Sequence, residues 1–308
     1  MPSSNSRRPL AVGVQLPEVE REVRWPELRQ MAHLAEAVGF DSVWVGDHLL
    51  YRPESGPPTG PWEAWSLLAA IAAVTDRVQI GPLVAATSFH SPAMLAKKAA
   101  TVDEISGGRL IVGLGAGWNR TEYDAFGFAY DRRVSRFEEA FTIIRSLLRE
   151  GRVDFAGEFY DAADCELLPP PRQGGPPLMV GSMGERMLQI TMPHVDMWNG
   201  WFQWYGNRVD GLGPLLSKVD AACEQVGRDP AEVARTVAVL VSPLEPEGRP
   251  AHGEQGGGVD PVTGTPEQIA GTLAGFAAAG IGHLQLVLDP ITVETIEFCG
   301  EVLAALDA

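Results

Sequence analysis

The sequence predicts an α/β fold, a (β/α)8 or TIM barrel. Two observations predict it: short apolar or β-branched runs alternate with longer helical patterns along most of the 308 residues, and the alternation repeats eight times. Parallel strands need crossover helices between them, and eight such units close into a barrel of about this length. An open, doubly wound sheet is the alternative. It has less support because the first turn after a strand, residues 17–20, lacks the glycine fingerprint of a dinucleotide site.

The strands and helices follow each other in order. The expected strands cover residues 10–16, 42–46, 78–84, 109–114, 178–181, 195–199, 236–241 and 283–288. The expected helices cover approximately residues 26–38, 62–74, 91–105, 133–150, 184–192, 205–226, 265–279 and 293–306. Pro26 lies in the first turn of the first helix, and Gly39 ends that helix as its C-cap. Ser91 and Pro92 begin the third helix as N-cap and N1.

The alternation pauses once, after the fourth helix. Residues 153–177 are rich in aromatic residues and proline, a pattern that predicts a hairpin followed by an extended loop. A Gly-rich loop is expected at 242–264. We therefore predict one barrel domain over residues 1–308, with an insertion at about 151–177.

The charge balance narrows the choice of partners. Lys and Arg together number 24 against 40 Asp and Glu, a formal net charge of −16. An acidic surface repels phosphate backbones and anionic lipid headgroups, so binding to nucleic acid or to a membrane surface is not expected. A bound phosphate must then be held locally, by backbone N–H groups or by a single Arg.

Cysteine and histidine usage argues against disulfides and metals. Cys165, Cys223 and Cys299 are widely spaced and form no CxxC pair, a usage that suits a reducing cytoplasm. The six histidines include no HExxH or HxH spacing, so we expect no metal site. Arg7 and Arg8 precede an apolar run that is too short for a signal peptide, and no run approaches the roughly 18 residues of a membrane span. We therefore expect a soluble cytoplasmic protein.

In a (β/α)8 barrel the active site lies at the C-terminal ends of the strands. Asp47 and His48 follow the second expected strand and form the acid–base pair among these ends. An imidazole can give or take a proton near neutral pH, and a neighbouring carboxylate can fix its tautomer. Alternatively, the two side chains point to opposite sides and one of them is only a loop contact. We expect no second carboxylate and no metal-ligand cluster at the strand ends.

Two glycine-rich turns and an aromatic cluster also follow strands. Residues 113–117 (GLGAG) lack the GK[ST] tail of a phosphate loop, and we expect their missing Cβ atoms to let a flat ring approach the backbone. Residues 181–184 (GSMG) open a helix, whose N–H groups and Ser182 hydroxyl would hold a phosphate; the alternative is an ordinary Ser cap. The aromatic cluster either packs in the core or forms the wall of a pocket. It consists of Trp198, Trp201, Phe202, Trp204 and Tyr205.

Residues 91–118, SPAMLAKKAATVDEISGGRLIVGLGAGW, carry the longest motif of the chain. This segment resembles the bacterial luciferase-like monooxygenase superfamily, and residues 39–48, 122–127, 181–184 and 264–267 support the resemblance. The resemblance implies a (β/α)8 barrel with an insertion after the fourth helix and a cofactor that is either coenzyme F420, a deazaflavin, or FMN. Asp-His after the second strand and GxGAGW after the fourth look most similar to the F420-dependent oxidoreductase branch.

The resemblance also implies roles for particular residues. Asp47 and His48 would lie beside the ring of the cofactor, with His48 placed to handle a proton. Leu83 and Val84 fall where relatives carry a bulge, often a cis peptide, behind the ring. The residues that would flank the ring or the substrate are Ala116, Gly117 and Trp118, and those that would meet the cofactor phosphate are Gly181, Ser182, Met183 and Gly184.

The chain also departs from the family. The F420-dependent glucose-6-phosphate dehydrogenases, which this chain resembles, carry Glu where Trp118 stands, and the loss of that carboxylate argues against sugar-phosphate oxidation. Many relatives have Arg in place of His90 and a second Gly in place of Ser182.

These observations favour one function over two others. The favoured reading is an oxidoreductase that transfers a hydride between F420 and a small or medium organic substrate. An FMN-dependent monooxygenase that uses reduced flavin and oxygen is the alternative, and a protein that holds a flavin-like ligand without turnover is the third. The resemblance implies a homodimer, and a flavin or F420 reductase as a partner if the cofactor is supplied reduced.

Overall fold

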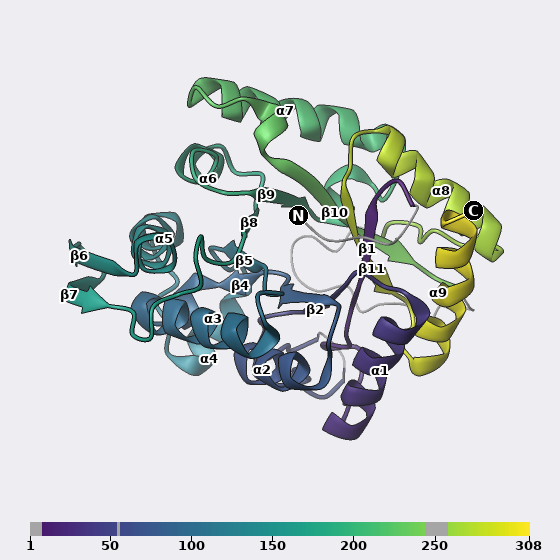
Figure 1. Cartoon of the computed structure of the whole chain (residues 1–308), viewed down its shortest axis with the longest axis horizontal. Coiled ribbons are helices and arrows are strands. Elements are labelled where there is room, and N and C mark those ends of the chain that lie inside the picture. The colour runs from purple at the N-terminus through teal and green to yellow at the C-terminus, as the bar shows by residue number, and fades with distance from the viewer. Residues whose placement is uncertain (1–7, 54–55, 244–257) are drawn as a thin grey trace.

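A parallel β-sheet forms the centre of the structure, and the helices lie around it (Figure 1). The computed structural model describes residues 8–53, 56–243 and 258–308. Residues 1–7, which include Arg7, and most of the expected Gly-rich loop at 242–264 lie outside the described residues. The predicted α/β barrel is confirmed by the order and direction of the strands.

Nine strands make up this sheet, in the order β3-β2-β1-β11-β10-β9-β8-β5-β4. They are β1 (Ala11–Gln15), β2 (Ser42–Val45), β3 (Gln79–Pro82), β4 (Ala85–Ala86), β5 (Val112–Gly115), β8 (Leu178–Gly181), β9 (Met197–Gly200), β10 (Ala234–Val241) and β11 (His283–Leu288). All the pairings within it are parallel. A bridge between Ile80 of β3 and Leu110, just before β5, connects one end of the sheet to the strand next to its other end, so that the sheet is nearly closed into a barrel.

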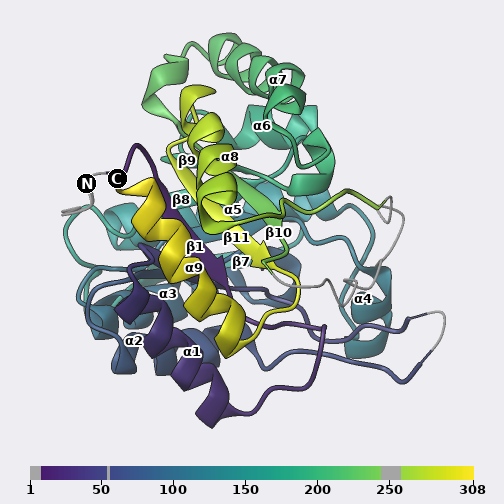
Figure 2. The same cartoon turned by 90° about the vertical axis from the view of Figure 1, so that its right-hand side faces the viewer.

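The helices cover the outside of the barrel. They are α1 (Trp25–Val38), α2 (Ala64–Val74), α3 (Pro92–Ser106), α4 (Arg120–Phe126), α5 (Arg133–Glu150), α6 (Glu185–Thr191), α7 (Leu212–Gln225), α8 (Pro266–Ala278) and α9 (Val293–Leu306). Short 3-10 helices are η1 (Thr87–Phe89), η2 (Phe202–Tyr205), η3 (Val209–Gly211) and η4 (Pro230–Glu232). Figure 2 shows α1, α9 and α8 packed in succession along one side of the sheet.

Local sequence signals begin and end several of these helices where expected. Gly39 and Gly107 lie in the left-handed region, with φ of 103° and 70°, and end α1 and α3. Thr265 and Gln268 form a capping box at the start of α8. Ser91 occupies the N-cap of α3, but its side chain makes no capping hydrogen bond.

The strand expected at 78–84 ends earlier, at Pro82 of β3, and a second, short strand that was not predicted, β4, follows it. β3 pairs with β2 and β4 pairs with β5, because the chain steps from one neighbour to the other at Leu83 and Val84. The peptide bond between these residues is cis, as the family resemblance implied.

Two helices also differ from expectation. α7 begins at Leu212 rather than near Tyr205, because Gly206 and Asn207 adopt left-handed φ angles of 65° and 55° that no helix continues through. The Asn207 side chain instead holds β10, donating to the Leu240 carbonyl and accepting from its N–H. The seven-residue helix α4 was not predicted as a helix.

The insertion after α5 forms the expected hairpin, from β6 (Arg152–Ala156) and β7 (Asp161–Glu166). The Glu139 carboxylate of α5 accepts hydrogen bonds from the N–H groups of Glu158, Phe159 and Tyr160 at the hairpin turn. This carboxylate fixes the hairpin beside α5, at the left of Figure 1.

Candidate active site

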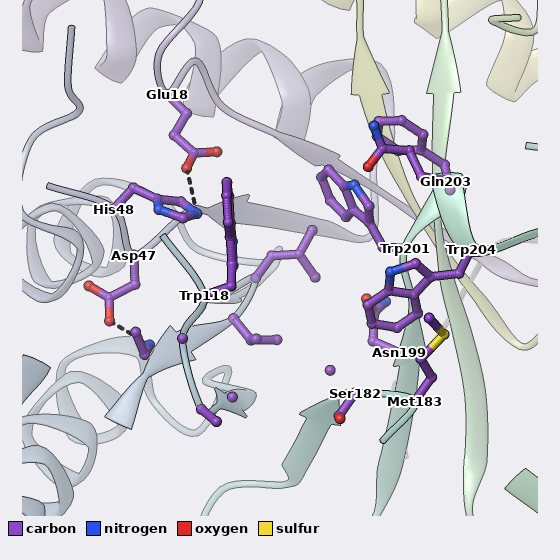
Figure 3. Close-up of a pocket in the computed structure, with 18 of the residues that line it drawn as sticks. Glu18, Asp47, His48, Trp118, Ser182, Met183, Asn199, Trp201, Gln203 and Trp204 are labelled. Atoms are coloured by element: carbon purple, nitrogen blue, oxygen red, sulfur yellow. Dashed lines mark hydrogen bonds and ion pairs between the residues drawn. The ribbon is translucent and has the colours of Figure 1, made fainter. Parts of the chain in front are cut away.

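A cavity of about 590 Å³ opens at the C-terminal ends of the barrel strands (Figure 3). That volume lies within the roughly 300–1,000 Å³ of small-molecule and cofactor sites. Every site residue that the sequence predicted lies in its wall: Asp47, His48, Leu83, Val84, Ala116, Gly117, Trp118, Gly181, Ser182, Met183 and Gly184. The strand-end rule and the resemblance therefore point to one place in the fold.

The His48 imidazole is held between two buried carboxylates. Its Nδ1 lies 3.0 Å and 3.1 Å from the two carboxylate oxygens of Glu122, and its Nε2 lies 3.5 Å from Glu18 Oε1. Glu122 also accepts from the backbone N–H groups of Leu49 and Leu50. Nδ1 thus has the shorter contact, to Glu122, and Nε2 has the longer one, to Glu18, on the cavity side.

This arrangement favours the protonated imidazole. Burial by itself would lower the pKa of His48, but the negative charges of Glu18, Glu122 and Asp47, together with the hydrogen bond to Glu122, raise it from 6.5 to about 9. His48 is therefore a cation at neutral pH, able to donate a proton and unable to accept one.

Asp47 lies next to His48 in the chain, but its carboxylate contacts other residues. Its Oδ2 accepts from the Ala86 N–H at 2.9 Å and lies 2.9 Å from His90 Nε2. Of the two interpretations of this pair, the structure agrees with the second: the side chains of Asp47 and His48 make separate contacts, and Glu122 makes the hydrogen bond to the imidazole Nδ1. The Oδ1 atom of Asp47 is buried and has no hydrogen-bond partner among the described residues.

The expectation of no second carboxylate is also wrong. Glu18, Glu122 and Asp289 line the cavity together with Asp47. Glu18 follows β1 and Asp289 follows β11, so the strand-end rule would have found both if it had been applied to the first and last strands. Glu122 lies inside α4, and no strand-end signal marks it.

The glycines of the predicted ring-binding turn are required by contacts within the protein rather than by a ring. A Cβ at Gly115 would lie 2.9 Å from Val84 Cγ2, and one at Gly181 would lie 3.1 Å from both methyl groups of Val84. A Cβ at Gly113 would also meet Val84, at 2.9 Å. Gly117 has φ +73°, and its Cβ would collide with the Tyr123 hydroxyl. These missing Cβ atoms make room for protein groups, so the argument from close approach of a ring fails.

The N-cap of α6 is Gly184, and no side chain makes a capping hydrogen bond there, so Ser182 is not the helix cap that the alternative interpretation expected. The Ser182 hydroxyl accepts from the Gly184 N–H at 3.2 Å, as a local turn contact. The helix that follows, α6, has only seven residues, and its first residue is the acidic Glu185. Met183 and Gly184 remain exposed in the cavity wall.

The aromatic cluster divides between wall and core. Trp201, Phe202 and Trp204 line the cavity, whereas Trp198 is fully buried in the core. Tyr205 is also buried, and its hydroxyl donates to the Ala238 carbonyl. Figure 3 shows Trp201, Gln203 and Trp204 on the opposite side of the cavity from His48 and Asp47.

Other site classes leave no trace in the described part of the chain. Its His, Cys, Asp and Glu side chains form no group of three or more that could hold a metal ion. The three cysteines are free. None of the helices within residues 8–53, 56–243 and 258–308 is long and apolar enough to cross a membrane.

Comparison with known proteins places this fold and cavity in a family. The sequence profile of the luciferase-like monooxygenases matches residues 10–248. The structure defines the class: a barrel protein with its site at the strand ends. The chain belongs to the luciferase-like monooxygenase family.

Relatives within the family carry different names. The chain is 38% identical over 232 residues to an F420-dependent glucose-6-phosphate dehydrogenase from Amycolatopsis mediterranei, covering 70% of this chain and 65% of the relative. It is 35% identical over 172 residues to the pyrimidine monooxygenase RutA from Cronobacter sakazakii, covering 54% of this chain and 50% of the relative. A 32% identical match to a 5,10-methylenetetrahydromethanopterin reductase from Archaeoglobus fulgidus covers 55% and 47%. The chain thus spans from about half to 65% of the length of these relatives.

Solved structures agree on the fold. An F420-dependent secondary alcohol dehydrogenase, in complex with an F420-acetone adduct, superposes with a TM-score of 0.80 at 20% identity, over 96% of this chain and 99% of that one. A riboflavin lyase with modified FMN superposes with a TM-score of 0.79 at 17% identity, over 96% and 90%. At these identities the likeness extends to the fold alone.

Proposed function

We propose that this chain transfers a hydride between coenzyme F420 and a small or medium organic substrate, with His48 as the proton donor. The observation that carries the proposal is the imidazole clamped by two buried carboxylates, Glu18 and Glu122, in the wall of the cavity. The 38% identical relative that is named as F420-dependent supports the same cofactor. We take the chain to act as a single barrel domain.

The residues present fit a deazaflavin or flavin. The cavity has the volume of a cofactor site. The Asp47 Oδ1 atom is buried and has no hydrogen-bond partner among the described residues, so it can accept from a donor, and the ring of either cofactor carries an N–H group. Asp47, Leu83, Val84, Ala116, Gly117 and Trp118 would hold the ring, and residues 181–184 would meet the phosphate. When bound, F420 supplies a carbon that carries a hydride and does not activate oxygen.

The protein's own contribution is the proton. Glu122 holds Nδ1, so the second proton of the His48 imidazolium lies on Nε2, on the side of Glu18. Since the pKa of His48 is about 9, this nitrogen donates at neutral pH, and reduction of the substrate is the direction that it serves. Trp201, Phe202 and Trp204 line the same cavity.

A binding titration of the purified apoprotein tests the cofactor. We expect F420 to bind tightly and FMN not to bind. A preference for FMN would move the chain to the oxygen-using alternative, which the match to the pyrimidine monooxygenase would then support. Binding of neither cofactor would overturn both readings in favour of a ligand carrier.

A substitution tests the role of His48. His48→Gln should lower turnover at least 100-fold, the lower end of general acid–base contributions, while cofactor affinity changes by less than threefold. His33→Gln, on the exposed face of α1, is the matched control. Unchanged turnover in His48→Gln would remove His48 from the chemistry.

A further inference from the structure

We propose that the aromatic side of the cavity binds an uncharged, flat substrate with a carbonyl oxygen, and that the cavity rejects anionic substrates. The inference rests on the proposed function, because it concerns the part of the same cavity that the cofactor leaves to the substrate. Three observations carry it: the charges of the wall, its aromatic side chains, and two hydrogen-bonding groups among them.

The charges in the wall are one-sided. Four carboxylates line the cavity, from Glu18, Asp47, Glu122 and Asp289. No Lys or Arg side chain does so among the described residues, and the His48 imidazole already lies between two of the carboxylates. The backbone N–H groups at residues 181–184 are assigned above to the cofactor phosphate. A phosphate or carboxylate on the substrate would therefore enter a low-dielectric space close to like charges and without a cationic side chain to pair with, which is costly. An uncharged substrate avoids this cost.

The side of the cavity opposite His48 is aromatic. Trp201, Phe202 and Trp204 come from the segment that follows β9, and all three line the cavity. The Trp201 and Phe202 rings lie 4.5 Å apart. In Figure 3, Trp118 stands between this group and His48. Such flat, polarisable surfaces bury planar apolar molecules well.

Two neutral polar groups lie within the aromatic side. The Trp204 indole nitrogen is buried and has no hydrogen-bond partner among the described residues. An indole N–H can only donate, so a ligand that satisfies it must bring an acceptor. The Gln203 amide lies in the same wall and adds a further neutral donor. A carbonyl oxygen supplies the acceptor without adding charge, and the imidazolium across the cavity is a donor as well.

Two pairs of matched probes test the inference. 4-Methylacetophenone and 4-acetylbenzoate have the same shape and differ by a methyl group and a carboxylate, and 4-isopropenyltoluene replaces the ketone oxygen by CH₂. Binding is measured by quenching of tryptophan fluorescence, with and without F420, so that the readout does not depend on turnover. We expect the neutral ketone to bind at least tenfold more tightly than the benzoate. Equal binding, or tighter binding of the benzoate, would overturn the proposal.

A substitution separates the hydrogen bond from the aromatic surface. Trp204→Phe should weaken binding of the ketone about three- to tenfold, the loss of one neutral hydrogen bond, and leave the hydrocarbon probe unchanged. The control is Trp62→Phe, since Trp62 is half-exposed outside the cavity and its indole donates to the Val23 carbonyl. An equal loss for both probes in Trp204→Phe would overturn the role of the indole N–H.

The two proposals fail in different ways. Discrimination between ketone and benzoate in a protein that does not bind F420 would refute the proposed function and leave the substrate class standing. Tight F420 binding without discrimination would refute the substrate class alone.

Discussion

Replacing Glu122 by Gln removes the charge that lies closest to the His48 ring. Glu122 contacts Nδ1 at 3.0 Å, whereas Glu18 lies 3.5 Å from Nε2. The glutamine oxygen can still accept from Nδ1, so the substitution changes the charge and keeps the shape. We expect the pKa of His48 to fall and the fraction of imidazolium at neutral pH to fall with it.

The size of the effect follows from the pKa of His48. The rise from 6.5 to about 9 corresponds to about 3 kcal/mol of preference for the charged imidazole, at about 1.4 kcal/mol per pKa unit. Three carboxylates produce it against burial, and Glu122 alone combines charge with a direct hydrogen bond. We therefore expect Glu122→Gln to lower the pKa of His48 by about 1 to 2 units, or about 1.5 to 3 kcal/mol.

The same charge links stability to pH. The folded pKa of His48 lies above the unfolded value, so its stabilisation is complete below pH 6.5 and is lost as pH rises through 9. The free energy of unfolding of the wild type should thus fall by up to about 3 kcal/mol over this interval, and that of Glu122→Gln should fall less.

The assay is an NMR titration of the imidazole C–H resonances, with the His48 signal assigned by its absence in His48→Gln. Glu297→Gln, an exposed substitution on α9, serves as the control. A pKa that stays at about 9 in Glu122→Gln would refute the view that the clamp sets the charge of His48.

Three further predictions concern stability, each measured by urea denaturation. Burial lowers the pKa of His283 to about 4, below the value of 6.5 in the unfolded chain. The free energy of unfolding should therefore fall as the pH drops from 6.5 to 4, and His283→Gln should reduce this dependence on pH. Gly117→Ala should lower the free energy of unfolding by about 1–3 kcal/mol, because residue 117 has a positive φ and the new Cβ would collide with Tyr123. The control is Gly271→Ala in α8, which has open space around it and should be neutral or stabilising. Equal effects of the two substitutions would contradict this explanation. Arg109→Lys should cost about 2–3 kcal/mol, because the guanidinium donates to four carbonyl groups that join the end of α2, the end of α3 and the residue before β3, and a lysine cannot reproduce that fork. A loss below about 0.5 kcal/mol, the ordinary range of surface changes, would contradict it.

The sequence was informative where a signal is local. Alternating periods predicted the order of strands and helices, and Gly39 and Gly107 marked helix ends through their own backbone conformation. The start of α7 was predicted too early because the left-handed conformation of Asn207 depends on its contacts with β10, which are distant in sequence. The split between β3 and β4 likewise depends on which neighbour each half meets.

The candidate site shows the same limit. Asp47 and His48 follow a strand and were found by position, but the partner of the imidazole, Glu122, lies 74 residues further along. No local pattern connects the two. The residues that fill the space beside Gly115 and Gly117 are also set by tertiary packing. The sequence therefore drew attention to these glycines but did not show that Val84 and Tyr123 require them.

The contacts of Val84 have a consequence for how this protein can vary. Its two methyl groups lie where Cβ atoms at Gly115 of β5 and Gly181 of β8 would be, whereas a Cβ at Gly113 would first meet the Pro82 carbonyl oxygen, at 2.3 Å. An alanine at 115 or 181 therefore requires residue 84 to shift or to become smaller, and a larger residue at 84 has no room while the backbone stays in place. Positions 84, 115 and 181 are thus coupled, and homologous sequences should show correlated changes among these three positions rather than independent drift.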